Sequence, residues 1–354
     1  MARIEKTLTV HLIDVGQGES VIVDYPDGRF SLMDGGPHVD GRHVLPEVRR
    51  RIEHGRVFDF AAITQWDKDH TAGIPRIVEE FSPSRFILPR SAAFVHELHK
   101  RGEMDRLAAE VYRCARAIRT EYATAGSPLL LLRPHIEVYA LAPGYRVEDE
   151  IIDAIEKGNG GVTKFRNRSS MAVWVRAWSR SLLIAGEVDS DQYREMQDYF
   201  LNPNSDLSRH RDDYKAAWIK LSHHGADGNN PPEMFKLFAS PRRFVASASA
   251  GGQYGHPHPL ALARVRQAGG IAMCTNLGTG CEHLIQGRGR RRPPDPRKPD
   301  SWLPHVRLLG TPASPSPCYG TVSIEVGSGG VVTVSGSSWQ DKCPYGGPTR
   351  AVAL

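Results

Sequence analysis

The chain has 354 residues, of which 40% are hydrophobic and 24% are charged. This is the composition of an ordinary globular protein whose core is large enough for one or two domains. No apolar run approaches the roughly 20 residues that cross a bilayer, which argues against a membrane protein. The formal net charge of +5 is too small to indicate nucleic-acid binding by itself.

Cysteine usage and the N-terminal residues favour a cytoplasmic protein. The five cysteines are an odd number, and residues 1–6 are charged and run directly into a strand pattern. Nothing there is typical of an export signal. In a chain of this length these features indicate a reducing compartment, where thiols stay free or bind metal. We therefore expect a cytoplasmic location and no association with membranes.

The N-terminal part predicts three strands joined by glycine-containing turns. Apolar runs cover residues 8–13, 21–25 and 30–33, and the first two are predicted to form a hairpin. Asp34 follows the third run, and the two glycines after it let the backbone pass close by. A carboxylate at such a strand end either orients a ligand shell or caps a turn.

Residues 63–73, with the sequence ITQWDKDHTAG, hold the densest group of potential metal ligands. Asp67, Asp69 and His70 lie between a predicted strand and a predicted helix, and the amide of Gln65 precedes them. In an extended chain, carboxylates two residues apart face the same way, and a turn at His70 would bring its imidazole to the same point. This arrangement predicts a site for a divalent cation, although an isolated D-x-D-H is equally typical of a capping turn.

More polar residues follow predicted strands further along the chain. They are Glu187, the pair His223 and His224, and the pair His256 and His258 between prolines. A lone histidine is usually a packed or solvated residue. Histidine pairs at strand ends, in a chain that already carries D-x-D-H, instead suit a metal site or a general acid and base. The prolines stiffen the last loop and hold both imidazoles.

Hydrophobic periodicity predicts the remaining elements. Apolar residues recur at three- and four-residue spacing from residue 91 to about 121, which predicts a helical segment that packs over a sheet or covers the site. A helix with proline in its first turn is predicted over residues 73–81. Strands are predicted over residues 58–64, 136–140, 171–175, 181–185, 217–221 and 243–247, with a hairpin over 321–326 and 331–334.

The order of these motifs resembles a known family. The resemblance runs from about residue 8 to residue 285 in unbroken motif order, and the family is the metallo-β-lactamase-fold domain of bacterial competence (DNA-uptake) channel proteins. It implies an α/β fold, the αββα sandwich of two facing mixed sheets with helices outside and a metal centre at one edge. The motifs are DVGQGES (14–20), LMDGG (32–36), DKDHTAG (67–73), NRSS (167–170), LSHHG (221–225) and YGHPHP (254–259).

The resemblance also implies a domain organisation. Residues 1–285 would form the metallo-β-lactamase-fold domain, with the helical segment at about 91–122 as an insertion. Residues 286–354 would form a basic, proline-rich loop and a C-terminal hairpin packed on the same domain. Since the membrane segments of the channel proteins are not found in this sequence, the chain resembles a free-standing soluble relative.

Carried over position by position, the resemblance implies a role for each candidate residue. Asp69 would orient the attacking water, and His256 or His258 would protonate the leaving oxygen. The implied metal ligands are Asp67 for a first ion, Asp69 and His70 for a second, Glu187 in place of a bridging aspartate, and His224 or His223 to complete the set. The implied surrounding residues are Asp34, Gln65, Asn167 and Ser170.

Two residues depart from the family pattern. The ligand loop of the competence-type branch reads His-x-Asp-x-Asp-His, and Gln65 stands where the first histidine is expected. Glu187 is longer than aspartate by one methylene, which favours displaced metals or a single bound ion. With oxygen ligands in the majority, one or two ions of manganese or magnesium are as well suited as zinc.

The resemblance implies a metal-dependent phosphodiester hydrolase, most simply a DNA nuclease that uses a metal-activated water. Nucleic acid, with DNA favoured, is then the expected partner. Two alternatives stay open. Gln65 and Glu187 are also compatible with a catalytically impaired protein that binds nucleic acid or a nucleotide on the same fold. A phosphodiesterase acting on a small, cyclic nucleotide is the other alternative.

Residues 287–298, with the sequence GRGRRRPPDPRK, carry six basic side chains against one acidic side chain. A proline-rich basic run of this kind is usually a solvated loop. In a nuclease it would also contact the phosphate backbone, with sequence-independent and salt-sensitive affinity. The predicted contacts are Arg288, Arg290, Arg291 and Arg292.

Four of the five cysteines lie in the C-terminal part of the chain. Their wide spacing does not match a C-x-x-C knuckle, so a structural zinc site is a weaker prediction than the metal centre. His283 could replace one of them as a ligand, while Cys114 is expected to be a packed thiol. The candidate zinc ligands are Cys274, Cys281, Cys318 and Cys343.

Overall fold

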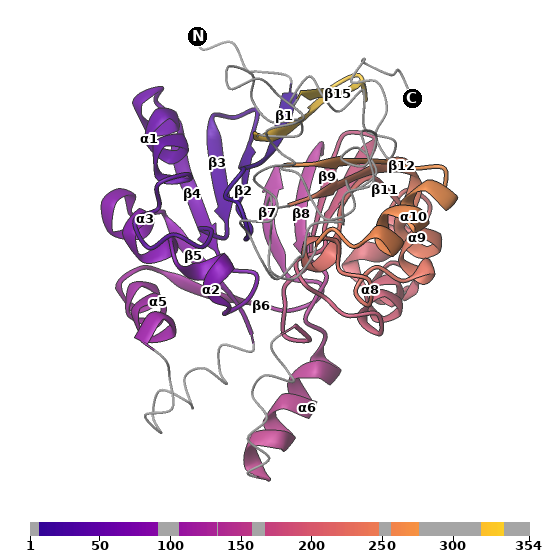
Figure 1. Cartoon of the computed structure of the whole chain (residues 1–354), viewed down its shortest axis with the longest axis horizontal. Helices are drawn as coiled ribbons and strands as arrows, with labels where there is room; N and C mark the ends of the chain where they lie inside the picture. The colour runs from indigo at the N-terminus through magenta and orange to yellow at the C-terminus, as the bar shows by residue number, and fades with distance from the viewer. Residues whose placement is uncertain are drawn as a thin grey trace, which may run out of the picture.

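The computed structural model describes residues 7–90, 106–132, 134–157, 167–247, 256–275 and 320–335. Two mixed β-sheets lie face to face, and helices cover the outer side of each sheet (Figure 1). The α/β sandwich expected from the motif order is therefore confirmed. Among the described residues, no helix combines the length and apolar character that crossing a bilayer requires.

The first sheet has eight strands in the order β15-β14-β1-β2-β3-β4-β5-β6. Strands β3 to β6 run parallel to one another, whereas the other neighbours are antiparallel. The C-terminal hairpin of β14 and β15 joins this sheet through β1. The strands are β1 (Thr7–Leu12), β2 (Val21–Asp24), β3 (Arg29–Met33), β4 (Val57–Ala62), β5 (Arg85–Pro89), β6 (Thr120–Ala123), β14 (Val322–Gly327) and β15 (Val332–Ser335).

The second sheet has seven strands in the order β13-β12-β11-β10-β9-β8-β7. Strands β10 to β13 are parallel, and β7 to β10 are antiparallel. The strands are β7 (Pro128–Leu132), β8 (Ile136–Ala140), β9 (Val173–Ala177), β10 (Arg180–Ile184), β11 (Ala216–Lys220), β12 (Ala239–Ala246) and β13 (Ile271–Cys274).

The helices form the two outer layers. Apolar side chains of α1, α3 and α5 pack on the first sheet, and those of α8, α9 and α10 pack on the second, while α6 projects from the sandwich (Figure 1). The helices are α1 (Leu45–Glu53), α2 (Lys68–Thr71), α3 (Ile74–Phe81), α5 (Arg106–Ala117), α6 (Tyr145–Glu156), α8 (Gln192–Leu201), α9 (Pro232–Phe238) and α10 (Pro259–Gln267), with 3-10 turns η1 (Asp206–His210) and η2 (Ser222–Gly225).

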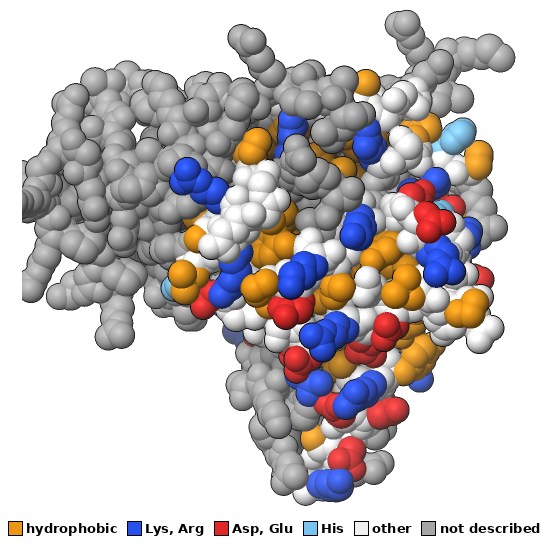
Figure 2. Space-filling model, turned by 90° about the vertical axis from the view of Figure 1, so that its right-hand side faces the viewer, with side chains coloured by type: hydrophobic (Ala, Val, Ile, Leu, Met, Phe, Trp, Pro, Cys, Tyr) orange, Lys and Arg blue, Asp and Glu red, His pale blue; other side chains and the backbone are white. Residues whose placement is uncertain are grey.

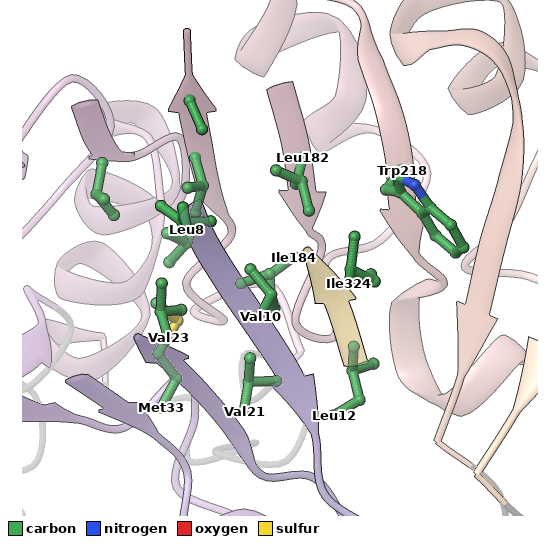
Figure 3. Close-up of a cluster of buried hydrophobic side chains, with 14 of the residues drawn as sticks. Leu8, Val10, Leu12, Val21, Val23, Met33, Leu182, Ile184, Trp218 and Ile324 are labelled. Carbon is green, nitrogen blue, oxygen red and sulfur yellow. The ribbon is translucent and has the colours of Figure 1, made fainter. Parts of the chain in front are cut away.

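The central core lies between the two sheets. On β1 the burial alternates, so Leu8, Val10 and Leu12 point inward while their neighbours face partly outward. These side chains share one apolar cluster with Ile184 of β10 and Trp218 of β11 (Figure 3). Complete burial of such side chains contributes about 1.5–3 kcal/mol each, which makes this layer the main source of cohesion between the sheets.

One predicted boundary is wrong. The helical periodicity continued to about residue 121, but α5 ends at Ala117 and residues 120–123 form β6, which pairs with β5. Thr120 and Tyr122 favour strands, and the open edge of β5 offers a hydrogen-bonding partner that a sequence pattern does not reveal. The earlier part of the predicted helix, residues 91–105, lies outside the described residues.

Each sheet contains a group of parallel strands, and these strands determine where the polar loops lie. The carboxyl ends of parallel strands lie at the same edge of a sheet, and loops at that edge form the usual ligand site of α/β folds. In the first sheet, β3 and β4 end at this edge, and in the second sheet β10 and β11 do so. The segments that follow these four strands are therefore brought together from distant parts of the sequence.

Candidate metal centre

Four side chains converge at this edge of the sandwich. Asp69 and His70 lie on α2, which follows β4, while Glu187 follows β10 and His224 lies in the turn η2 after β11. One potential ligand atom from each of the four residues lies within 4.8 Å of the others. We call these four residues the ligand cluster.

The ligand cluster offers two imidazole nitrogens and two carboxylate oxygens. His224 Nε2 lies 3.1 Å from Asp69 Oδ2 and 3.2 Å from Glu187 Oε1. His70 Nε2 lies 3.1 Å from Glu187 Oε1 and 4.0 Å from Asp69 Oδ2. Imidazole suits zinc and other transition metals, and carboxylate suits manganese and magnesium, so the donor set fits a divalent cation of either kind.

Asp34 fixes the orientation of His70. The Asp34 Oδ2 atom lies 2.7 Å from His70 Nδ1, which leaves Nε2 directed into the ligand cluster. Thr64 holds this carboxylate in turn, because its backbone nitrogen donates to Oδ1 at 2.7 Å and its hydroxyl donates to Oδ2 at 2.6 Å. A carboxylate on the outer nitrogen of a ligand histidine is the usual support of a metal site. Asp34 thus lies where a residue that orients the ligands would be expected.

The charges of the ligand cluster require compensation. Burial opposes protonation of His70 and His224, but the neighbouring carboxylates outweigh it and raise the pKa of both imidazoles. Burial likewise opposes ionisation of Glu187, but hydrogen bonds from His224 and His70 lower the pKa of its carboxyl well below the usual value. The folded protein thus favours protonated imidazoles beside these carboxylates, and a bound divalent cation would compensate the same negative charge.

Backbone and polar contacts position Glu187 and His224. The Glu187 nitrogen donates to Ser170 Oγ at 2.9 Å, and the His223 nitrogen donates to the Gly186 carbonyl at 3.0 Å. His223 and His224 both adopt left-handed backbone conformations, with φ of 48° and 54°. Non-glycine residues in this region of backbone conformation are strained, and such residues cluster at functional sites. The strained backbone of η2 sets the direction in which its two imidazoles point.

His223 does not belong to the ligand cluster, although it borders it. Its Nε2 lies 3.7 Å from Glu187 Oε2, and its Nδ1 lies 3.1 Å from the side-chain nitrogen of Asn167. The side chain is 29% exposed, in contrast to 2% for His224. Of the two histidines that the sequence left open, the structure therefore directs His224 into the cluster and His223 toward its solvent side.

The other two predicted histidines lie in different surroundings. The ring of His256 packs against that of His223 with centroids 5.4 Å apart. Burial and the neighbouring imidazoles lower the pKa of His256 to about 4, so it is neutral at pH 7 and better suited to accept a proton than to supply one. His258 Nδ1 instead accepts from the Leu260 nitrogen at 3.2 Å and caps α10.

Asp67 lies outside the ligand cluster, for a reason that its sequence spacing concealed. Residues 68–71 form the short helix α2, and Asp67 occupies its N-cap position. Side chains two residues apart at a helix start point in different directions, so the extended-chain argument for Asp67 and Asp69 is wrong. Gln65, two positions earlier, is fully buried, and neither atom of its amide has a hydrogen-bond partner among the described residues.

The C-terminal candidates are mostly not covered by the structure. Arg288, Arg290, Arg291 and Arg292 lie outside the described residues, and so do Cys281, Cys318 and Cys343. Cys274 is a buried residue at the end of β13. The basic run and the zinc site therefore remain predictions from sequence.

Two charged residues near the ligand cluster were not predicted. Glu19 and Lys220 form a buried ion pair directly beside it. The only sequence signals were a lysine at the end of an otherwise apolar strand run and a glutamate within the segment at residues 14–20. Neither signal indicated that the two residues meet, because 201 positions separate them.

The chain was compared with known protein families and with curated proteins. No protein-family model matches the chain. The chain is 22% identical over 270 residues to ComE operon protein 3 from Bacillus subtilis (strain 168). The match covers 72% of this chain but only 30% of that protein, so the chain spans less than a third of the curated relative's length.

Solved structures similar to this chain include several metallo-hydrolases. Igni18, a metallo hydrolase from Ignicoccus hospitalis, is 15% identical with a TM-score of 0.43 and covers 76% of this chain and 96% of its own. Tm1679, a metal-dependent hydrolase of the β-lactamase superfamily, is 13% identical with a TM-score of 0.43, covering 76% and 97%. The resemblance to competence-type proteins, first indicated by the motifs, is thus also found in the sequence comparison with ComE operon protein 3.

Proposed function

We propose that this chain is a metal-dependent phosphodiester hydrolase whose substrate is DNA. The observation that carries the proposal is the convergence of Asp69, His70, Glu187 and His224 within 4.8 Å of one another at the edge of the sandwich. When bound there, a divalent cation would supply an activated water and offset negative charge on a phosphoryl oxygen.

The residues of the chain divide the remaining tasks. His70, Glu187 and His224 are almost completely buried and would hold the ion, whereas the side chain of Asp69 is 30% exposed and can be reached from solvent. Asp69 would therefore bind the metal ion and also orient the water molecule that attacks the substrate. His223, also on the exposed side and held by Asn167, is placed to hydrogen-bond to the substrate.

Two arguments favour DNA over other phosphodiesters. The motifs resemble the metallo-β-lactamase-fold domain of competence DNA-uptake proteins, and the matched relative is ComE operon protein 3. The basic run at residues 287–298 would add a phosphate-backbone contact.

On the side of α8, α9 and α10, the described side chains of Lys and Arg alternate with those of Asp and Glu (Figure 2). We therefore place the DNA at the ligand-cluster edge and not on that mixed-charge face.

DNA cleavage with defined metals tests the proposal. Linear, circular and single-stranded DNA are incubated with the protein and manganese, magnesium or zinc, beside the variants Asp69→Ala and Asp67→Ala. We expect Asp69→Ala to abolish cleavage and Asp67→Ala to retain part of it, since Asp67 lies outside the ligand cluster. Cleavage that survives Asp69→Ala would place the activity at another centre.

The same experiment separates the alternatives. Gln65 and Glu187 favour a second candidate, a protein that binds nucleic acid or a nucleotide without cleaving it. In that case wild-type protein would retain DNA in a filter-binding assay while producing no fragments with any of the three metals. Hydrolysis of a cyclic nucleotide in the absence of DNA cleavage would instead identify a small-nucleotide phosphodiesterase.

A further inference from the structure

A buried ion pair joins the two halves of the ligand cluster. Lys220 is the last residue of β11 in the second sheet, and Glu19 lies in the loop between β1 and β2 of the first sheet. Each side chain is only 2% exposed. The Lys220 ammonium donates to the Glu19 carboxylate and, at 3.1 Å, to the carbonyl of Gly186.

Both ends of this pair reach a segment that carries ligands. On the first sheet, the Glu19 nitrogen donates to the carbonyl of Asp69 at 3.1 Å. Gly18 lies so close to this same carbonyl that a side chain there would collide with it. On the second sheet, Lys220 holds Gly186, the residue immediately before Glu187. The contacts thus run from Asp69 through Glu19 and Lys220 to Glu187.

Such a connection matters because the ligand cluster is divided between the sheets. Asp69 and His70 follow β4 of the first sheet, while Glu187 and His224 follow β10 and β11 of the second. The apolar contact between the sheets is non-directional and tolerates small shifts. A binding site tolerates only about 0.5 Å, so it needs directional contacts from its supporting residues.

The pair also controls the charge near the cluster. A carboxylate oxygen of Glu19 lies within 4.8 Å of potential ligand atoms of Asp34 and His70, which makes Glu19 a competing ligand. The contact with Lys220 neutralises Glu19, and Glu19 in turn neutralises an ammonium that would otherwise repel a cation. A buried pair of this kind contributes more to specificity than to stability, because desolvation offsets its attraction.

We propose that Glu19 and Lys220 are positioning residues that hold the ligands of the two sheets at the separation that binds a divalent cation. The proposal rests on the metal centre of the proposed function and adds to it two residues outside the ligand cluster. It requires that metal affinity and coordination geometry change when the pair is broken, even where the fold is retained.

Isothermal titration calorimetry with manganese alone measures the metal affinity of the wild-type protein and of three variants, and this tests the proposal. Glu19→Gln keeps the side-chain shape but leaves the ammonium without its counter-charge. The double variant Glu19→Gln with Lys220→Met removes the positive charge as well as the clamp. Asp24→Asn is the matched control, because it makes the same carboxylate-to-amide change in the partly buried contact of Asp24 with Arg51, at the opposite end of β2 and β3.

We expect Glu19→Gln to weaken manganese binding about 10- to 100-fold, the usual effect of losing a residue that supports a metal ligand. The double variant should remain at least about tenfold weaker than wild type, and its cobalt(II) absorption spectrum should differ from that of the wild type. Asp24→Asn should lose stability without a change in affinity or spectrum. If Glu19→Gln does not fold, the double variant still decides, since buried ion pairs can often be replaced without loss of folding.

Two results would overturn the proposal while leaving the metal centre intact. One is wild-type affinity in Glu19→Gln. The other is a double variant that regains both wild-type affinity and the wild-type spectrum, because the pair would then act through charge alone. Wild-type protein that binds no manganese, zinc or cobalt would overturn the metal centre and this inference together.

Discussion

Two polar groups in this molecule combine histidine with carboxylates but differ in how their charges are satisfied. At one end of β2 and β3, Asp24 contacts His11 at 3.0 Å and Arg51 at 2.9 Å, and Arg51 also reaches Glu47 at 2.9 Å. We call these four residues the Asp24 network. At the other end lies the ligand cluster, to which no arginine or lysine of the described part of the chain donates a hydrogen bond.

The two groups differ in the source of their positive charge. In the Asp24 network, the buried guanidinium of Arg51 supplies the positive charge permanently. In the ligand cluster, the positive charge comes from imidazoles whose pKa the carboxylates raise, and which would release a proton to solvent if a metal bound. Residue types alone therefore do not distinguish the two groups; among the described residues, the source of the positive charge does.

The largest expected effect is the loss of a ligand. His224→Ala removes one of two imidazoles, and because ligand losses exceed the 10- to 100-fold effect of supporting residues, manganese affinity should fall by more than about 100-fold. The increase in melting temperature on adding manganese should disappear with it. His11→Ala, the corresponding change in the Asp24 network, should keep the manganese-induced increase. Equal losses in both variants would remove the distinction between the two groups.

A smaller effect is expected from Asp24→Asn, measured as the free energy of unfolding in urea. Burial opposes ionisation of Asp24, but hydrogen bonds from His11 and Arg51 outweigh it and lower the pKa from its ordinary 3.8 to about 2. This difference corresponds to about 2 kcal/mol of stability at neutral pH. Because the folded pKa is the lower one, that stability should be lost as the pH falls from about 4 to about 2. A variant as stable as the wild type at pH 7 would contradict this account.

The ligand cluster should show the opposite pH dependence. The pKa values of His70 and His224 are raised in the folded state, so their contribution to stability is present below the ordinary histidine value of 6.5 and is lost as the pH rises through the raised values. Metal-free protein should therefore lose stability above neutral pH, and manganese should restore it. Thermal unfolding between pH 6 and pH 9, with and without manganese, measures this, and a pH-independent effect of the metal would argue against proton displacement.

The smallest effect should come from His258, which the sequence grouped with the site. Its contact with the Leu260 nitrogen caps α10, so His258→Ala should cost about 0.5–1 kcal/mol of stability. Manganese affinity should stay at the wild-type value. A loss of affinity in this variant would extend the metal centre to the loop before α10.

The sequence was informative where polar residues follow apolar runs. Glu187 and the pair His223 and His224 were predicted because a strand must end where such a run ends, and the structure places them in the segments that follow β10 and β11. Asp67 was misplaced because α2 is only four residues long, too short to produce a visible helical period. The end of α5 was misplaced because the pairing of β6 with β5 depends on a neighbour, not on local pattern.

The local sequence pattern could not predict that the residues of the ligand cluster lie close together in space. That β4 of one sheet and β10 of the other end at a common edge depends on the facing of the two sheets, which the motif resemblance supplied and the spacing of the residues did not. The contact of Glu19 with Lys220 could not be predicted either, because neither residue belongs to a predicted ligand group. Polar residues that support a site leave weaker sequence signals than the residues that form it.

Crystals of the protein soaked in manganese test the central claim most directly. Anomalous diffraction locates the ion without reference to activity or substrate. We predict one strong peak bounded by Asp69, His70, Glu187 and His224. A peak elsewhere, or no peak at this edge of the sandwich, would contradict the assignment of these four residues as a metal centre.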